Sequence, residues 1–342
     1  MAIEYEMRDG ALVWIKNPIT GVISYVVDVR GKSFAFTLGG REELQPGTSV
    51  PSADELRRTI DACPFCPGNE NLAPPELMRL VPAEFPDWTG GQSEGAPWVM
   101  RVFNNLFPRI PAELTNRRNE SYVVVEDPRH FANHPRGISD VMRTGMLGEE
   151  HFFRLLQTDV RLMHHMFENP SVNSVVIRKN QGRESGASQP HLHQQLIGSP
   201  APLPALEAEV VAERRHPDLW SELIALVERF GLVIERNGSV VSYSNPVGAF
   251  PRSYDVVMPG FRGMMTELNA SELRPFARAL FRIVHILGAL PLDYEIHQGG
   301  GLPLHAHVNS RLYPYSNVAG TLNLPSVLVQ NVAALRKALA RN

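Results

Sequence analysis

The chain has 342 residues, enough for about two ordinary domains, and its 43% hydrophobic and 20% charged content is typical of a folded globular protein. A net charge of -3 provides no basic excess, so neither nucleic acid nor an anionic membrane is an expected partner. The first ten residues lack the basic start and apolar core of a signal peptide, and no apolar run reaches about 18 residues, so we expect a cytoplasmic protein.

The first chemical motif along the chain is the cysteine pair Cys63 and Cys66, the two cysteines of the sequence. A thioredoxin-like redox pair needs a preceding strand and a following helix. Here a helix is predicted before the pair, over residues 53–61, and Pro67-Gly68-Asn69 follows it. Metal ligation is therefore the favoured interpretation, with redox chemistry as the alternative.

An internal repeat organises the remainder of the chain. Its first copy contains, in order, strand-like segments, an amphipathic helix and two more strands, over residues 102–108, 121–126, 152–163, 175–177 and 191–197. The second copy has the same order over residues 244–251, 254–258, 269–287 and 304–308, its helix opened by a capping box of Asn269 and Glu272. Each copy ends in a His-x-His strand at the same place, so His305 and His307 are matched with His191 and His193, and Asn309 stands where the first copy has Gln195. A helical stretch over residues 206–229 bridges the copies.

This repeat predicts an α+β fold of two related halves, each an antiparallel sheet with packed helices. We expect the halves to be residues 1–198 and residues 199–342.

The closing strand of the first copy carries the densest set of chemically useful side chains. Alternate residues of a strand share one face, so His191, His193 and Gln195 are expected on a single surface. The preceding residues 180–188 contain Gly182 and Gly186, and small residues let backbone N–H groups approach phosphate oxygens closely. A histidine beside such a loop can be a phosphorus nucleophile, a general base or a metal ligand, and the alternative is an ordinary polar strand.

Two other sets of residues extend this site. Cys63, Cys66, His130 and His191 form a candidate Cys₂His₂ set suited to tetrahedral Zn²⁺, with His134 as an alternative to His130. Arg183 lies within the glycine-containing loop, where it is either a phosphate contact or a solvated charge.

Several of these segments together resemble the galactose-1-phosphate uridylyltransferase family of the histidine-triad superfamily. The matching segments are Cys63–Glu70, Val102–Asn105, Asp127–His130, Asn180–Gln195, Pro303–His307 and Val318–Gly320. The resemblance implies two histidine-triad-like halves and a ping-pong nucleotidyltransferase that acts on a nucleoside diphosphate sugar and a sugar 1-phosphate. In that reaction His193 attacks the α-phosphorus and carries the nucleotidyl group as a covalent intermediate.

The resemblance also assigns roles to individual residues. Gln195, Asn180, Gly186 and Ser188 are expected at the phosphates, and Phe103 and Asn105 at the nucleoside. It implies zinc at Cys63, Cys66, His130 and His191, and a second zinc or iron at His297, His305, His307 and Glu209, with Glu207 as the alternative carboxylate. A homodimer is a further implication.

Four positions depart from the family pattern, and they leave the substrate open. Leu192 replaces the usual proline between the histidines, and Leu196-Ile197 stands where a tryptophan is common. A paired arginine motif is absent from the N-terminal segment, although Arg30 and Arg41 are candidates, and Thr321-Leu322 replaces a Phe-Glu that contacts the sugar. The alternatives are therefore a phosphorylase that uses inorganic phosphate, a hydrolase of nucleotide anhydrides, or a non-catalytic nucleotide-binding protein. Gln195 argues against the hydrolase, because related hydrolases carry a third histidine there and an amide cannot protonate a leaving group.

Overall fold

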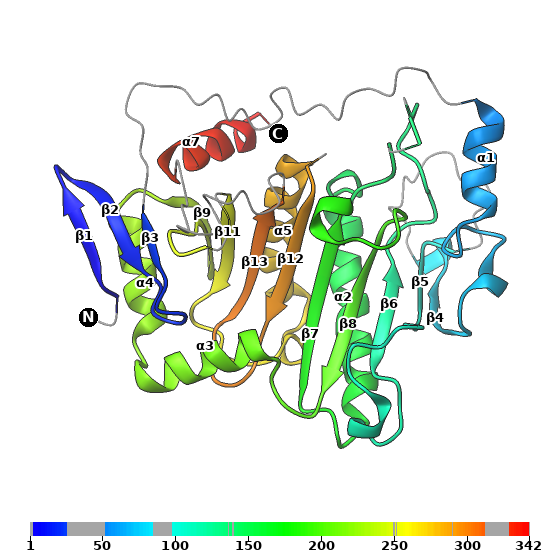
Figure 1. Cartoon of the computed structure of the whole chain (residues 1–342), viewed down its shortest axis with the longest axis horizontal. Coiled ribbons are helices and arrows are strands. Elements are labelled where there is room, and N and C mark those ends of the chain that lie inside the picture. Colours follow the sequence, from blue (N-terminus) through cyan, green and yellow to red (C-terminus); the bar gives the residue numbers. More distant parts are fainter. Residues whose placement is uncertain are drawn as a thin grey trace.

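A single ten-stranded sheet forms the centre of the molecule (Figure 1). The computed structural model describes residues 3–25, 52–84, 98–135, 137–138, 140–248, 250, 252–288, 290–311 and 328–341. The strand order is β4-β5-β6-β8-β7-β12-β13-β11-β10-β9, and every neighbouring pair is antiparallel. The strands are β4 (Glu76–Leu80), β5 (Met100–Asn104), β6 (Ser121–Val125), β7 (Ser174–Gln181), β8 (His193–Ser199), β9 (Val233–Asn237), β10 (Val240–Ser244), β11 (Ser253–Met258), β12 (Leu292–His297) and β13 (Leu304–Ser310).

Two long helices cover one face of this sheet, behind it in Figure 1, and pack against each other. They are α2 (Glu149–Phe167) and α5 (Ala270–Leu287), and both bury an apolar stripe, for example Phe152 and Phe276. The predicted capping box at Asn269 and Glu272 is present at the start of α5. The C-terminal α7 (Leu328–Leu339) packs beside α5, β9 and β10.

The remaining elements lie at the edges and on the other face. They are α1 (Ala53–Asp61), α3 (Pro204–Arg215), α4 (Leu219–Arg229) and a three-stranded sheet of β1 (Tyr5–Arg8), β2 (Ala11–Lys16) and β3 (Ile23–Tyr25). The helical stretch predicted over residues 206–229 is present as two helices, because α3 ends at Arg215 and its C-cap His216 (φ -138°, ψ 81°) stands directly before Pro217. A proline disfavours the helical conformation of the residue before it, which separates α3 from α4.

The strand order itself shows the repeat. Strands β5, β6, β7 and β8 with α2 correspond to β10, β11, β12 and β13 with α5, and the pair β7–β12 joins the two five-stranded parts. The predicted α+β fold of two related antiparallel halves is thus confirmed, as one continuous sheet. The division after residue 198 falls at the end of β8 and stays a proposal.

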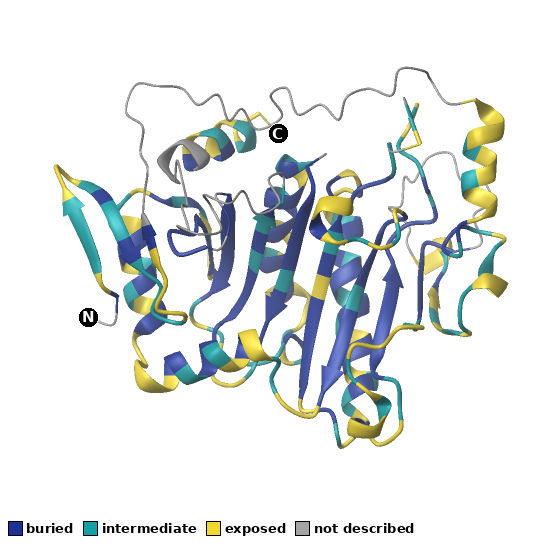
Figure 2. Ribbon diagram, in the orientation of Figure 1, coloured by how far each residue is buried: buried dark blue, intermediate teal, exposed yellow. Residues whose placement is uncertain are grey.

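Figure 2 shows that the strands of the sheet are mostly buried, whereas α1 and the outer faces of the other helices are exposed. Among the described residues, no helix combines the length and apolar character needed to cross a membrane. The candidate residues Arg30, Arg41, Thr321 and Leu322 and the segment Val318–Gly320 lie outside the described residues.

Candidate active site and metal centres

His193 opens β8 at the edge of a pocket of about 370 Å³. Its ring nitrogen Nδ1 lies 2.8 Å from the carbonyl oxygen of His191, to which only a protonated Nδ1 can donate. The other nitrogen, Nε2, therefore carries the lone pair. Burial, with the nearby charge of Lys179, lowers the pKa of His193 to about 4, so the ring is neutral at physiological pH.

One wall of the pocket is the loop between β7 and β8, which supplies Ser185, Gly186 and Ser188, and Asn180 lines the pocket from β7. Asn180 donates from its side-chain amide to the carbonyl oxygen of Ser185, which fixes the loop over the end of β7. Gly186 has φ +86°, and a side chain there would meet the Asn180 amide at 3.3 Å. A residue with a Cβ would therefore be strained at this position, which favours glycine. A loop whose backbone approaches phosphate closely is expected to contain such a position.

Buried polar groups on the face of the sheet opposite the His193 side chain hold β8 in place. Lys179 donates to the carbonyl oxygen of His193 at 2.8 Å and pairs with Glu126 at 2.5 Å, with both side chains fully buried. Gln194 donates to both oxygens of Asp159 on α2 and accepts from the Tyr294 hydroxyl. The backbone that carries His193 is therefore tied to α2, β7 and β12.

The first candidate metal centre is the set Cys63, Cys66, His130 and His191, whose ligand atoms all lie within 4.8 Å of one another. All four residues are buried, and Nδ1 of His191 faces both sulfurs, at 3.6 and 3.5 Å. Its Nε2 lies 2.8 Å from the carbonyl oxygen of Asp127, which accepts its proton and sets the ring orientation. The hydrogen bond from Cys66, with those from His130 and His191, lowers the pKa of the Cys63 thiol, so a thiolate forms readily. This donor set and geometry fit a tetrahedral metal ion.

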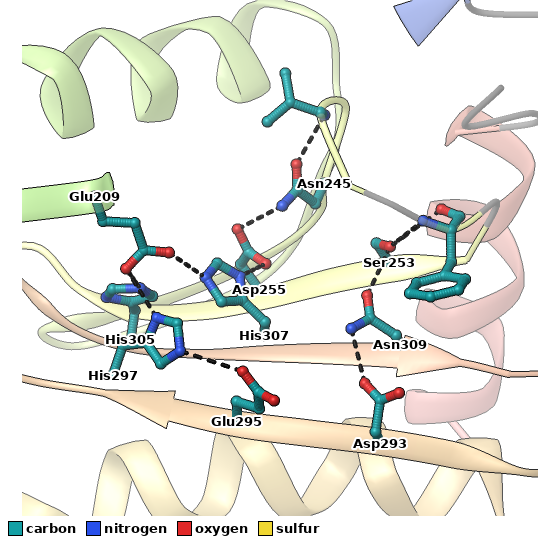
Figure 3. Close-up of polar contacts among 12 residues, drawn as sticks. Glu209, Asn245, Ser253, Asp255, Asp293, Glu295, His297, His305, His307 and Asn309 are labelled. Atoms are coloured by element: carbon teal, nitrogen blue, oxygen red, sulfur yellow. Dashed lines mark hydrogen bonds and ion pairs between the residues drawn. The ribbon is translucent and has the colours of Figure 1, made fainter. Parts of the chain in front are cut away.

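The second candidate metal centre, shown in Figure 3, consists of Glu209 from α3 with His297, His305 and His307 from β12 and β13. Its four ligand atoms also lie within 4.8 Å of one another. Glu209 approaches all three rings. The buried Nε2 atom of His305 lies 3.2 Å from Oε2 of Glu209 and makes no hydrogen bond within the described residues. Of the two candidate carboxylates, the structure brings Glu209 to the histidines.

The nitrogens of these histidines that point away from Glu209 also have acceptors. His297 contacts Glu295 at 3.4 Å, His305 donates to the Pro303 carbonyl oxygen at 2.8 Å, and His307 pairs with Asp255 at 2.8 Å. Metal-binding histidines characteristically donate their second nitrogen in this way. The set therefore fits a divalent metal ion.

The register of the two halves differs from the one we inferred from the sequence. His305, like His193, donates from Nδ1 to the carbonyl oxygen of the residue two positions before it. The two histidines also have equivalent strand partners: His193 pairs with Val125 on β6, and His305 pairs with Val257 on β11. Matching His305 with His191 is thus wrong by two residues: His305 takes the place of His193, and His307 that of Gln195.

A second pair of hydrogen bonds supports this register. Gln181 at the end of β7 accepts from the backbone of Thr144, and Gln298 directly after β12 accepts from the backbone of Met265 in the equivalent turn. His297 therefore occupies the place of Asn180. The three histidines of the second candidate metal centre stand where the first half has His193 and two amides.

Three predicted nucleotide-binding residues do not line the 370 Å³ pocket at His193. Phe103 is only 2% exposed and packs between Phe65 and Arg101 beneath the first metal centre. Asn105 uses its side-chain oxygen to cap the loop at Phe107. Arg183 is exposed and lines an adjoining pocket of about 570 Å³, which His193 also lines. Sequence reasoning instead missed Arg109 and Arg178, which do line the 370 Å³ pocket.

Comparisons with known proteins agree with this architecture. A family model described as "Domain of unknown function (DUF4921)" matches residues 119–255. ADP-glucose phosphorylase from Arabidopsis thaliana is 27% identical over 163 residues, which are 44% of this chain and 40% of that protein. The aligned stretch thus spans less than half the length of this relative.

Solved structures match over a longer range. The crystal structure of the Arabidopsis thaliana ADP-glucose phosphorylase with bound ADP-glucose has a TM-score of 0.66 at 18% identity, over 95% of this chain and 98% of that one. A uridylyltransferase mutant has a TM-score of 0.61 at 19% identity, over 83% of this chain and 95% of that one. The resemblance to the galactose-1-phosphate uridylyltransferase family is thereby confirmed: the chain has the fold that ADP-glucose phosphorylase and the uridylyltransferases share.

Proposed function

We propose that this protein transfers the nucleotidyl group of a nucleoside diphosphate sugar to a phosphate acceptor through a covalent intermediate on His193. The observation that carries the proposal is the tautomer of His193, whose Nδ1–H is engaged by the His191 carbonyl oxygen while Nε2 is free beside the pocket. A neutral imidazole with a fixed lone pair is a competent phosphorus nucleophile.

In the first half-reaction, Nε2 attacks the α-phosphorus and forms a P–N bond while the bond from that phosphorus to the bridging oxygen breaks. The sugar 1-phosphate leaves with the bridging oxygen and its electron pair. In the second half-reaction an acceptor phosphate oxygen attacks the same phosphorus, and the P–N bond breaks to restore neutral His193. Gln195, Asn180 and the backbone near Gly186 are proposed to bind the phosphoryl oxygens, since they adjoin His193 in the same pocket.

The acceptor is either a sugar 1-phosphate, as the family resemblance implies, or inorganic phosphate. Inorganic phosphate is favoured because the sequence relative is an ADP-glucose phosphorylase. The solved structures do not separate the two acceptors, since a phosphorylase and a uridylyltransferase each match over 98% of their own length. We therefore propose a phosphorylase of nucleoside diphosphate sugars as the second form of the same activity. Both forms share the first half-reaction and differ only in what enters afterwards.

Zinc is the proposed metal of the Cys₂His₂ set, and zinc or iron that of the His₃Glu set, because thiolate and imidazole donors suit zinc and a carboxylate with imidazoles also suits iron. When bound, the first ion would hold the Cys63–Cys66 loop against β8. His191 lies two residues before His193 and supplies the carbonyl oxygen that sets its tautomer, so an ordered His191 keeps Nε2 available. We assign both ions a structural role and no step of the transfer.

Intact-protein mass spectrometry tests the proposal directly. The protein is incubated with ADP-glucose, UDP-glucose and other nucleoside diphosphate sugars, and a mass increase of one nucleotidyl group is expected for the cognate compound. His193→Ala should form no adduct, whereas His164→Ala, a change on α2 outside the pocket, should form it normally. A folded wild-type protein without an adduct from any donor would refute covalent transfer.

The isolated adduct then distinguishes the acceptors. Inorganic phosphate should release a nucleoside diphosphate if the enzyme is a phosphorylase, and a sugar 1-phosphate should regenerate a nucleoside diphosphate sugar if it is a transferase. Rapid release by water alone would show a hydrolase and contradict both forms of the proposal.

A further inference from the structure

The pocket beside His193 carries an unusual balance of charge. Among the described residues that line it, the charged side chains are two arginines, Arg109 and Arg178, and no carboxylate is among them. A pocket of this size with two cations, amides and a glycine-containing loop favours an anion with several charges. A nucleoside diphosphate has such a group, because it contains one phosphate beyond the reacting one.

Arg178 lies at the junction of the two halves of the sheet. On β7 it pairs directly with Gln195 on β8 and, on its other side, with Glu295 on β12. Glu295 in turn pairs with His307 on β13. Directly paired residues of neighbouring strands project from the same face, so a polar row runs from Gln195 through Arg178 to the second metal centre.

One guanidinium nitrogen of Arg178 is fixed and two are available. Nε lies 3.1 Å from Oε1 of Glu295, and the side chains are 48% and 31% exposed. Within the described part of the chain, the terminal nitrogens of Arg178 make no hydrogen bond. A guanidinium anchored through Nε presents these two nitrogens as a fork, the geometry that binds phosphate in a bidentate manner.

The pair Arg178–Glu295 contributes little to stability in itself. An exposed ion pair of this kind adds at most about 1 kcal/mol. The contact between Arg178 and Glu295 is therefore better explained by a role in the pocket that Arg178 lines than by its contribution to folding stability.

We propose that Arg178, held by Glu295 from the other half of the sheet, binds the β-phosphate of the nucleoside diphosphate sugar and, in the return step, the phosphate of the acceptor. The proposal rests on the proposed function for the identity of the ligand. Gln195 and Asn180 lie closest to His193 and serve the α-phosphate, and Arg178 serves the phosphate that departs or enters. It makes the pocket selective for a diphosphate over a monophosphate.

The test compares the affinities of nucleoside diphosphate and monophosphate by isothermal titration calorimetry, with ADP against AMP and UDP against UMP. Wild-type protein should bind the diphosphate more tightly. Arg178→Gln should weaken diphosphate binding about tenfold, as expected for loss of a partly exposed charged hydrogen bond, and leave monophosphate binding unchanged. Arg178→Lys should recover only part of the loss, since an ammonium cannot form the bidentate contact.

Two further variants sharpen the result. Arg274→Gln removes an equally exposed arginine that pairs with Glu150 on the helical face, and it should change neither affinity. Glu295→Ala should lower the preference for the diphosphate several-fold, because the guanidinium loses its anchor, whereas Glu295→Gln retains an acceptor for Nε and should keep most of it.

The outcomes separate this inference from the covalent proposal. A wild type that shows no preference for the diphosphate, or binds neither ligand, overturns the inference, as does an Arg178→Gln variant that loses both ligands equally or neither. A stronger diphosphate preference in Glu295→Ala would show that Glu295 competes with phosphate and would overturn its anchoring role. The absence of an adduct on His193 with a normal Arg178 effect would refute only the covalent step.

Discussion

The buried pair Lys179–Glu126 beneath the nucleophile provides the most quantitative test of the site. Lys179 and Glu126 have side chains that are 1% and 0% exposed, and Nζ lies 2.5 Å from Oε1. The other Glu126 oxygen accepts from the Thr144 hydroxyl at 2.9 Å. Lys179→Met would leave the Glu126 carboxylate buried without a cation, which costs about 3–5 kcal/mol.

A double replacement should recover most of this loss. Glu126→Gln with Lys179→Met removes both charges and keeps an acceptor and donor near Thr144, so its cost should be about 1–2 kcal/mol. The difference between the single and double variants measures the penalty of an unpaired buried charge. Arg274→Gln at the exposed Arg274–Glu150 pair is the matched control and should cost less than about 1 kcal/mol.

Urea unfolding, followed in parallel by circular dichroism and tryptophan fluorescence, measures these free energies if the two transitions coincide. The reasoning is refuted if Lys179→Met costs no more than the Arg274→Gln control. It is also refuted if the double variant is as unstable as the single one, because the loss would then come from the bond to the His193 carbonyl oxygen or from packing.

Three other predictions concern the metal centres and the buried acid on α2. Asp255→Asn should weaken metal binding at the His₃Glu set about 10- to 100-fold in chelator competition, since it alters the acceptor of His307, whereas Asp293→Asn should not. Cys66→Ser should remove one zinc per chain by elemental analysis and lower solubility; unchanged zinc content would contradict the assignment. Burial raises the pKa of Asp159 well above its usual value, so its folded form holds a proton that the unfolded chain releases as pH rises above about 4. Asp159 therefore makes the wild type less stable as pH rises. The melting temperature of Asp159→Asn, relative to wild type, should increase from pH 5 to pH 8. A melting-temperature difference that stays constant would refute the raised pKa of Asp159.

Local patterns in the sequence were sufficient for the elements of the repeat and for the cysteine pair of the first metal centre, whereas the resemblance supplied its two histidines. The helix before Cys63 and the capping box at Asn269 depend on residues close together in the chain, and both are present. The break before Pro217 was also available from the sequence, since the restriction that proline imposes on His216 is local.

Features that depend on distant pairings could not be predicted in the same way. From the sequence, Arg178 is an ordinary exposed residue of a strand with buried neighbours. Its position opposite Glu295 depends on the pairing of β7 with β12, which local patterns do not predict. Phe103 belongs to a matching motif, but its burial depends on Phe65 and Arg101 from other segments. The register of the repeat was two residues in error because both halves contain a His-x-His, and only the hydrogen bond of Nδ1 shows which histidine corresponds to His193.

That register explains why one half of the sheet offers a nucleophile and the other does not. His193 and His305 both present Nε2 on the same face, but the neighbours of His193 are amides, whereas Oε2 of Glu209 lies 3.2 Å from Nε2 of His305. His305 is also fully buried, and its ring packs against Trp220 of α4. Removing the metal should therefore not create a second covalent site, and the adduct should remain at one nucleotidyl group per chain after chelation. A second adduct on His305 in the chelated protein would show that metal occupancy, and not Glu209 and burial, keeps this half inactive.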